Sequence, residues 1–151
     1  MKKLSLSLIL PQLAGGIGAF FTISSINSWY RYLNKPTFSP PNWLFGPVWF
    51  VLYLLMGFAL YLNWIKKTKQ AKFNVRLFFI QLFFNLIWTP VFFGMKNLFL
   101  SLLIIFIIWL LIIVMIFQFY KVNKPSSWLL FPYFLWVSFA GLLNYFIWKL
   151  N

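Results

Sequence analysis

The chain has 151 residues, of which 63% are hydrophobic and 9% are charged, and all thirteen charged side chains are lysine or arginine. Because it has no aspartate, glutamate, histidine or cysteine, we exclude ordinary acid–base catalysis, haem ligation by histidine, disulfides and a metal site, and we expect no cofactor. Soluble domains carry about 25% charged residues of both signs, so this composition indicates that the main solvent of the protein is the lipid bilayer.

Five apolar stretches are long enough to cross a bilayer, which takes about 20 residues. They lie at residues 4–26, 43–65, 75–93, 98–120 and 128–148. Together they use most of the chain, so the sequence predicts one all-α domain over residues 1–151, an integral membrane bundle of five transmembrane helices. The N-terminal Met-Lys-Lys is typical of a signal peptide, but no small-residue cleavage site precedes a polar mature domain. We therefore interpret this stretch as the first span.

Residues 29–43, between the first two spans, combine aromatic side chains with prolines. Pro36, Pro40 and Pro41 fix φ and keep the residues before them out of the helical region. These prolines predict an extended, stiffened loop that acts as a lid, whose aromatic residues lie near the lipid headgroups. An ordinary interfacial aromatic belt is the alternative interpretation, although a belt does not require a rigid loop.

Three spans carry aromatic and amide residues at helical spacing, so that each set shares one helix face. The sets are Trp49 and Tyr53, then Gln81, Asn85 and Trp88, then Tyr133, Trp136, Ala140 and Asn144. One interpretation is structural, because membrane-buried amides commonly form interhelical hydrogen bonds and aromatic rings commonly fill the interior of a bundle. In combination they also provide apolar walls with a few polar groups, which is the usual composition of a small-molecule site.

Prolines and turn residues mark the ends of the later spans. Pro90 and Pro132 each remove a helical hydrogen bond, which predicts kinks near one end of the third and fifth spans. A tight turn at residues 94–97 makes the third and fourth spans antiparallel neighbours. The serines of Pro125-Ser126-Ser127 are the expected N-cap of the fifth span.

The basic residues flank the predicted spans, nine on one side of the membrane and four on the other. The nine are Lys2, Lys3, Lys66, Lys67, Lys69, Lys72, Arg76, Lys121 and Lys124, and the four are Arg31, Lys35, Lys96 and Lys149. The positive-inside rule then predicts an N-terminus on the cytoplasmic or equivalent side. This arrangement favours anionic lipid headgroups as the partner of residues 66–76 and excludes nucleic acid, which needs a continuous basic face.

Three segments resemble the translocator protein family, also called tryptophan-rich sensory proteins or peripheral-type benzodiazepine receptors. They are WYRYLNKPTFSPPNWLFGPVWFVLYLLMGFAL from Trp29, QLFFNLIWTPVFFGMKNLFLSLL from Gln81 and LLFPYFLWVSFAGLLNYFIWKLN from Leu129. The resemblance implies a five-helix bundle, often a homodimer, in a bacterial cell membrane or the mitochondrial outer membrane. It also implies a pocket under the first loop that binds porphyrins, sterols and synthetic aromatic ligands.

Carried over to this sequence, the resemblance assigns two sets of residues. The pocket set is Tyr30, Trp49, Tyr53, Asn85, Trp88, Trp136 and Ala140, and the sterol motif is Leu143, Tyr145 and Lys149. The third span departs from relatives that dimerise through small residues there, because it is rich in Phe and Leu. Small residues at the spacing of a helix–helix contact occur instead in the first span, at Ala14 and Gly18 and at Gly15 and Ala19.

Three function classes stay open on the sequence. The first is a membrane receptor or translocator that binds tetrapyrroles and related apolar aromatic or sterol ligands. The second is a light-dependent porphyrin-degrading protein in which Trp49 and Trp136 take part in the photochemistry. The third is a membrane scaffold without a transported ligand. Proton-coupled transport is disfavoured, because proton relays in membranes use Asp, Glu or His.

Overall fold

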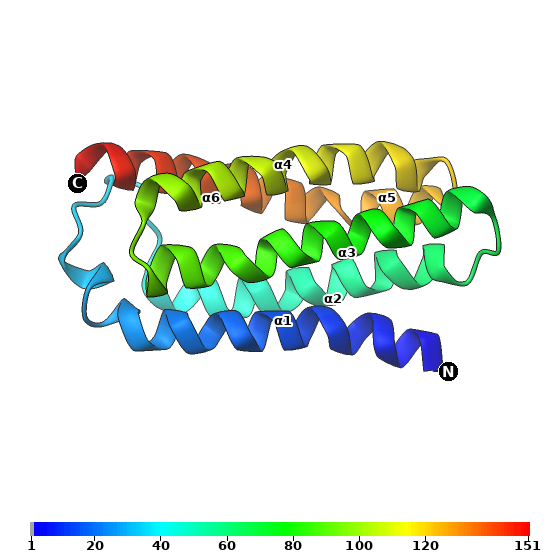
Figure 1. Cartoon of the computed structure of the whole chain (residues 1–151), viewed down its shortest axis with the longest axis horizontal. Helices are drawn as coiled ribbons and strands as arrows, with labels where there is room; N and C mark the ends of the chain where they lie inside the picture. The colour runs from blue at the N-terminus through cyan, green and yellow to red at the C-terminus, as the bar shows by residue number, and fades with distance from the viewer. Residues whose placement is uncertain (1) are drawn as a thin grey trace.

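The computed structural model describes residues 2–151, and within that range every regular element is a helix (Figure 1). The long helices are α1 (Lys2–Ile26), α2 (Phe45–Trp64), α3 (Lys69–Thr89), α4 (Leu98–Tyr120) and α6 (Phe131–Leu150). The short elements are the 3₁₀ turns η1 (Tyr30–Tyr32) and η2 (Asn42–Leu44), the π turn η3 (Pro90–Gly94) and helix α5 (Lys124–Trp128). Five segments of this set are long and apolar enough to cross a membrane, which confirms the predicted all-α bundle.

The observed helix boundaries agree with the predicted spans where a capping residue lies at the edge of the apolar run. Helix α4 covers the predicted 98–120, because the Asn97 side chain accepts a hydrogen bond from the Leu100 N–H at 2.9 Å. Helix α3 begins six residues earlier than predicted, at Lys69, because Thr68 caps it and the basic residues after that cap are good helix formers. The cap of the fifth segment is Asn123, so the serine cap was wrong.

Pro90 and Pro132 lie at two different kinds of helix junction. Pro90 begins the π turn η3, in which the Met95 N–H donates to the Pro90 carbonyl oxygen at 2.8 Å. Pro132 lies in the first turn of α6, where its missing N–H has no intrahelical acceptor to lose. A two-residue break precedes α6, so the fifth segment is two helices, α5 and α6, instead of one kinked helix.

The five long helices lie side by side, with the N-terminus at one end and the first loop and C-terminus at the other (Figure 1). Helix α1 packs mainly on α2 and α3, and α4 packs mainly on α3 and α6. Gly57 permits the closest approach of α1 to α2, since a Cβ there would lie 2.6 Å from the backbone oxygen of Ser7. The predicted tight turn joins α3 to α4 and contains Lys96 in the left-handed region, with φ of 57°.

Candidate functional site

A cavity of about 660 Å³ lies in the half of the bundle nearer the first loop. Its walls are formed by α1, α2, α3 and α6, together with η1, η2 and η3, and no lining residue in the described range belongs to α4. The seven residues of the predicted pocket set all line this one cavity: Tyr30, Trp49, Tyr53, Asn85, Trp88, Trp136 and Ala140. The fold therefore brings them together from four separate elements, and their role in binding stays a prediction.

Aromatic rings provide most of the wall. Trp49 stacks on Tyr53 with ring centroids 5.4 Å apart and an interplanar angle of 30°. Trp88 stacks on Phe92 at 5.2 Å and 24°, across the junction of α3 with η3. Phe45 meets Trp136 edge-to-face at 6.1 Å. These stacked and edge-to-face pairs fix the rings in place, so the cavity has preformed flat walls.

A hydrogen-bonded chain crosses the floor of the cavity and joins α2, α3 and α6. The Tyr53 hydroxyl donates to Asn85 Oδ1 at 2.6 Å, and Asn85 Nδ2 donates to the Tyr133 hydroxyl at 2.8 Å. Gln81 Nε2 also donates to the Tyr133 hydroxyl. The amides of α3 are therefore interhelical contacts, as the alternative interpretation expected, and of the two only Asn85 also lines the cavity.

The two indole N–H groups of Trp88 and Trp136 differ in their partners. Trp88 Nε1 donates to Asn144 Oδ1 at 3.3 Å. Trp136 Nε1 is buried and has no hydrogen-bond partner among residues 2–151. A buried donor without a partner carries a desolvation cost of about 1–3 kcal/mol. Trp136 therefore contributes its ring to the cavity wall, while its N–H is a buried donor without a partner.

Tyr30 closes the loop end of the cavity. Its ring is buried against Phe92 and Phe93, with centroid distances of 6.1 and 5.5 Å, and Lys35 Nζ lies 4.8 Å from its centroid. Burial raises the pKa of Tyr30 to about 12, because the ionised phenolate would lose its hydration. The phenol is therefore neutral at physiological pH.

The proline-rich part of the first loop lies outside the cavity. The Asn34 N–H donates to Asn151 Oδ1 at 3.0 Å, and Asn151 Nδ2 donates back to the Asn34 carbonyl at 3.0 Å. Phe38 packs edge-to-face on Phe139 and Phe146 of α6. None of Pro36, Pro40 and Pro41 is among the lining residues, so this segment is fastened to the side and end of α6.

The structure separates the three residues of the sterol motif. Leu143 is buried and lines the cavity, whereas the Tyr145 and Lys149 side chains are exposed on α6. The Tyr145 ring packs on Phe146 and Trp148 instead of facing the cavity. The motif therefore does not form one surface.

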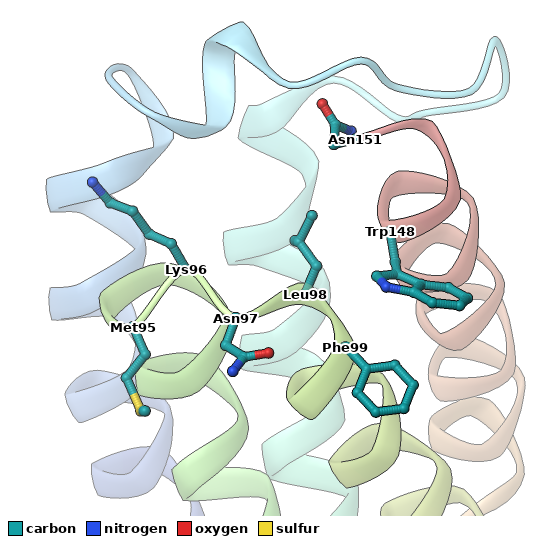
Figure 2. A pocket seen from close by; sticks show the side chains of 7 residues that line it. All are labelled: Met95, Lys96, Asn97, Leu98, Phe99, Trp148 and Asn151. Carbon is teal, nitrogen blue, oxygen red and sulfur yellow. The ribbon is translucent and has the colours of Figure 1, made fainter.

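A second, smaller hollow of about 390 Å³ lies at the α3–α4 turn (Figure 2). It is lined by residues 95–99 with Trp148 and Asn151, none of which belongs to the predicted pocket set. Figure 2 shows the Lys96 side chain extending away from Phe99 and Trp148, and its Nζ lies 6.0 Å from the centroid of the Trp29 ring. This hollow lacks the aromatic enclosure of the first cavity.

The sequence reasoning missed the contribution of α1 to the cavity. Gly15, Gly18 and Ala19 line it, although their spacing was interpreted as a contact between helices of different subunits. A Cβ at Gly15 would lie 2.5 Å from the Tyr53 ring, and one at Gly18 would lie 3.1 Å from the Thr89 hydroxyl oxygen. The run of small residues was the signal, and it serves packing within the chain.

Comparison with known proteins agrees with this architecture. The profile of the TspO/MBR family matches residues 7–149. The tryptophan-rich protein TspO of Archaeoglobus fulgidus is 40% identical over 99% of this chain and 97% of its own, and that of Chlorobaculum tepidum is 41% identical over 98% and 95%. The translocator protein of Bos taurus is 34% identical over 95% and 86%. With matches over nearly its whole length, this integral membrane protein belongs to the TspO/MBR family.

Proposed function

We propose that this protein is a membrane receptor or translocator that binds porphyrins and related apolar aromatic or sterol ligands in the cavity near the first loop. The observation that carries the proposal is the preformed aromatic enclosure, to which Trp49, Trp88 and Trp136 contribute rings from three different helices. Its volume of about 660 Å³ lies within the 300–1,000 Å³ that is typical of small-molecule sites. Flat rings gain about 0.5–1.5 kcal/mol for each stacked pair beyond the area they bury.

The names of relatives support transport or sensing as the outcome of binding. Bos taurus has a translocator protein, and Cereibacter sphaeroides has a tryptophan-rich sensory protein. Both outcomes require a ligand that enters and leaves without being altered. The absence of carboxylate, imidazole and thiol groups from the chain fits a binding protein better than an enzyme.

The test is a tryptophan-quenching titration with protoporphyrin IX and with cholesterol, in the dark, on protein in lipid nanodiscs. Trp136→Phe should weaken porphyrin binding by up to about tenfold, since it removes part of a stacking surface worth about 0.5–1.5 kcal/mol. Trp128→Phe is the matched control, because Trp128 is exposed and does not line the cavity. Equal affinities for the two variants would contradict the pocket assignment and favour a scaffold.

A light-dependent reaction of the bound porphyrin is the second candidate, because Trp49 and Trp136 both line the same cavity. Illumination of the complex should then bleach the porphyrin spectrum in the wild type. Bleaching that is lost in Trp49→Phe or Trp136→Phe while dark affinity is kept would assign these residues to photochemistry. Bleaching that is equal with and without protein would remove this candidate.

The orientation in the membrane forms part of the proposal. Nine basic residues between Lys2 and Lys124 lie outside the first loop and the α3–α4 turn, and all nine are exposed. Their segments lie at the end of the bundle that holds the N-terminus (Figure 1). No acidic side chain neutralises them, so anionic headgroups on the cytoplasmic side are their expected partners. Single cysteines at Lys69 and Thr37 should be labelled from opposite sides of the membrane, and labelling from one side would refute the topology.

We also include the homodimer that the family resemblance implies. The small residues of α1 are used inside the chain, so the contact is expected on exposed apolar side chains, of which α1 carries Leu13, Ile17 and Phe20. Cross-linking through Ile17→Cys in nanodiscs that hold two chains tests this surface. The absence of a cross-linked dimer there would place the contact on another helix.

A further inference from the structure

The residues that line the cavity divide sharply by exposure. On α3, η3 and α6, every lining residue that the structure describes is buried or half-buried. The exposed lining residues lie on α1 and on η2 with the start of α2, and include Gly16, Ile23, Asn27, Trp43, Gly46 and Phe50. The cavity therefore opens on one side only, between α1 and α2.

Two glycines mark this opening. A Cβ built on Gly16 or on Gly46 would meet no described heavy atom within 4 Å, apart from its own local backbone. The neighbouring Gly15 is the opposite case, because its Cβ would lie 2.5 Å from the Tyr53 ring. Gly15 therefore packs against the Tyr53 ring, whereas the adjacent Gly16 faces open space.

Helices α1 and α2 contact each other on the N-terminal side of the opening. They are in backbone contact where Gly57 meets Ser7, nearer the N-terminal end of α1. Gln12 Nε2 donates to the Phe50 carbonyl oxygen at 3.0 Å and bridges the two helices where the gap begins. Beyond this bridge the gap runs toward the first loop.

The gap lies at the depth of the lipid chains. Gly16 is ten residues from the end of α1 at Ile26, which corresponds to about 15 Å of helix. The hydrocarbon core of a bilayer is about 30 Å thick. The opening therefore reaches from the headgroup region at Asn27 to about the middle of the bilayer, and its rim faces acyl chains.

The alternative entrance, from water beneath the first loop, is obstructed. The Tyr30 side chain of η1 is buried against η3. Asn34 and Asn151 exchange hydrogen bonds that hold the loop to the end of α6. A ligand taking this route would have to break those contacts. The gap between α1 and α2 requires no bond to be broken.

We propose that apolar ligands enter and leave the cavity sideways, from the bilayer, through this gap, which we call the lateral mouth (residues 16–27, at and just after the end of α1, and 42–50 of η2 and α2). The identity of the ligand rests on the proposed function, but the route does not. The mouth admits molecules already dissolved in the membrane, so their concentration in lipid sets the rate of entry.

The first test follows the route without a porphyrin. Because the chain has no cysteine, Ala140→Cys places a single thiol in the cavity, and its reaction with pyrene maleimide dissolved in the bilayer can be timed. Adding Gly16→Phe or Gly46→Phe should slow this labelling at least tenfold. The matched controls Ile17→Phe and Val51→Phe, which are exposed on the same helices but do not line the cavity, should change it less than twofold.

Labelling that is unaffected by both glycine variants would overturn the lateral mouth. Labelling that accelerates in Asn34→Ala, which releases the loop, while Gly46→Phe has no effect, would assign entry to the loop instead. The labelling rate is measured in each glycine variant separately. If one variant fails to fold, the rate in the other still tests the route.

The second test uses stopped-flow quenching by protoporphyrin IX. Gly46→Phe should slow association and dissociation together, each by tenfold or more. Equal rates in Gly46→Phe and Val51→Phe would overturn the route. If the porphyrin fails to quench the wild type while thiol labelling depends on Gly46, the proposed ligand is wrong and the lateral mouth stands.

Discussion

The two halves of the bundle use the same kinds of polar residue for different purposes. In the half that holds the N-terminus, Asn63 Nδ2 donates to the Ser126 hydroxyl at 2.8 Å, and Asn74 Nδ2 donates to Asn63 Oδ1 at 2.7 Å and to the Gln118 carbonyl at 3.0 Å. Gln70 completes this cluster through Asn74 and Gln118. It ties α2, α3, α4 and α5 together, and we call it the closed network.

The half nearer the first loop holds comparable groups around an open space. There the chain from Tyr53 to Tyr133 is bonded, yet Trp136 Nε1 and Gln81 Oε1 have no partner among residues 2–151. Buried polar groups are normally all paired, so the half that holds the cavity is the one whose polar core is less completely satisfied. The contrast teaches which amides to test for stability and which for binding.

The largest effect is expected in the closed network. Asn74→Ala removes three hydrogen bonds and leaves acceptors buried, so it should lower the free energy of unfolding by about 2 kcal/mol. Thermal unfolding in detergent measures this, with the exposed Lys72→Ala on the same helix as control. Porphyrin affinity should not change, and a loss of affinity equal to that of Trp136→Phe would break the comparison.

A pair of adjacent glycines gives the next effect. Gly15→Ala forces a Cβ against the Tyr53 ring, so it should destabilise by about 1–2 kcal/mol. Gly16→Ala faces open space and should stabilise by up to about 1 kcal/mol through helix propensity. Unfolding of the two variants under the same conditions checks the opposite signs, and equal signs would show that α1 does not pack as described.

A smaller effect sharpens the role of the bonded chain beside the cavity. Tyr53→Phe removes one hydrogen bond and frees Asn85 Oδ1, at a cost of about 0.6 kcal/mol in a membrane. Asn85 lines the cavity, so its freed oxygen can approach the open axial position of zinc protoporphyrin, which should gain affinity relative to the free-base porphyrin, whose N–H groups point into the centre of the ring. Parallel titrations with the two porphyrins measure this, and an unchanged ratio would show that Asn85 does not reach the ligand.

The smallest effect in the physiological range concerns Tyr30. Burial raises its pKa to about 12 from an ordinary 10.0, so the folded protein holds this proton after the unfolded chain has lost it. Its contribution to stability is therefore complete below pH 10 and is lost as the pH rises from 10 toward 12. The difference between the wild type and Tyr30→Phe should stay flat from pH 6 to 9 and narrow above pH 10, as followed by chemical unfolding.

The sequence predicts much of the fold because transmembrane length and capping are local properties. The span at 98–120 was placed correctly, since Asn97 caps it at the edge of its apolar run. The start of α3 at Lys69 was missed, because the helix continues past the apolar run into basic residues. The break between α5 and α6 was predicted only as a kink, because a proline alone does not say whether a helix bends or restarts.

The candidate site was predictable where side chains carry a pattern. Aromatic and amide stripes on α2, α3 and α6 indicated the residues that now surround one cavity. Helix α1 was missed as a wall because glycine lacks a side chain to form a stripe, and its neighbours are set by tertiary packing. The amides Asn63 and Asn74 also gave no signal, because the sequence does not show which side chains of other helices become their hydrogen-bond partners.

The π turn at Pro90–Gly94 makes this part of the chain sensitive to its length as well as its composition. The turn holds one more residue per hydrogen-bonded loop than an α-helix does, and it places both Phe92 and Phe93 in the cavity wall. Deleting one residue there would let the turn close as a regular α-helix with the chain after it in nearly the same orientation, but it would shift or remove one of the two adjacent rings of the wall. A one-residue deletion between residues 90 and 94 should therefore alter the cavity wall more than it alters the packing of α4.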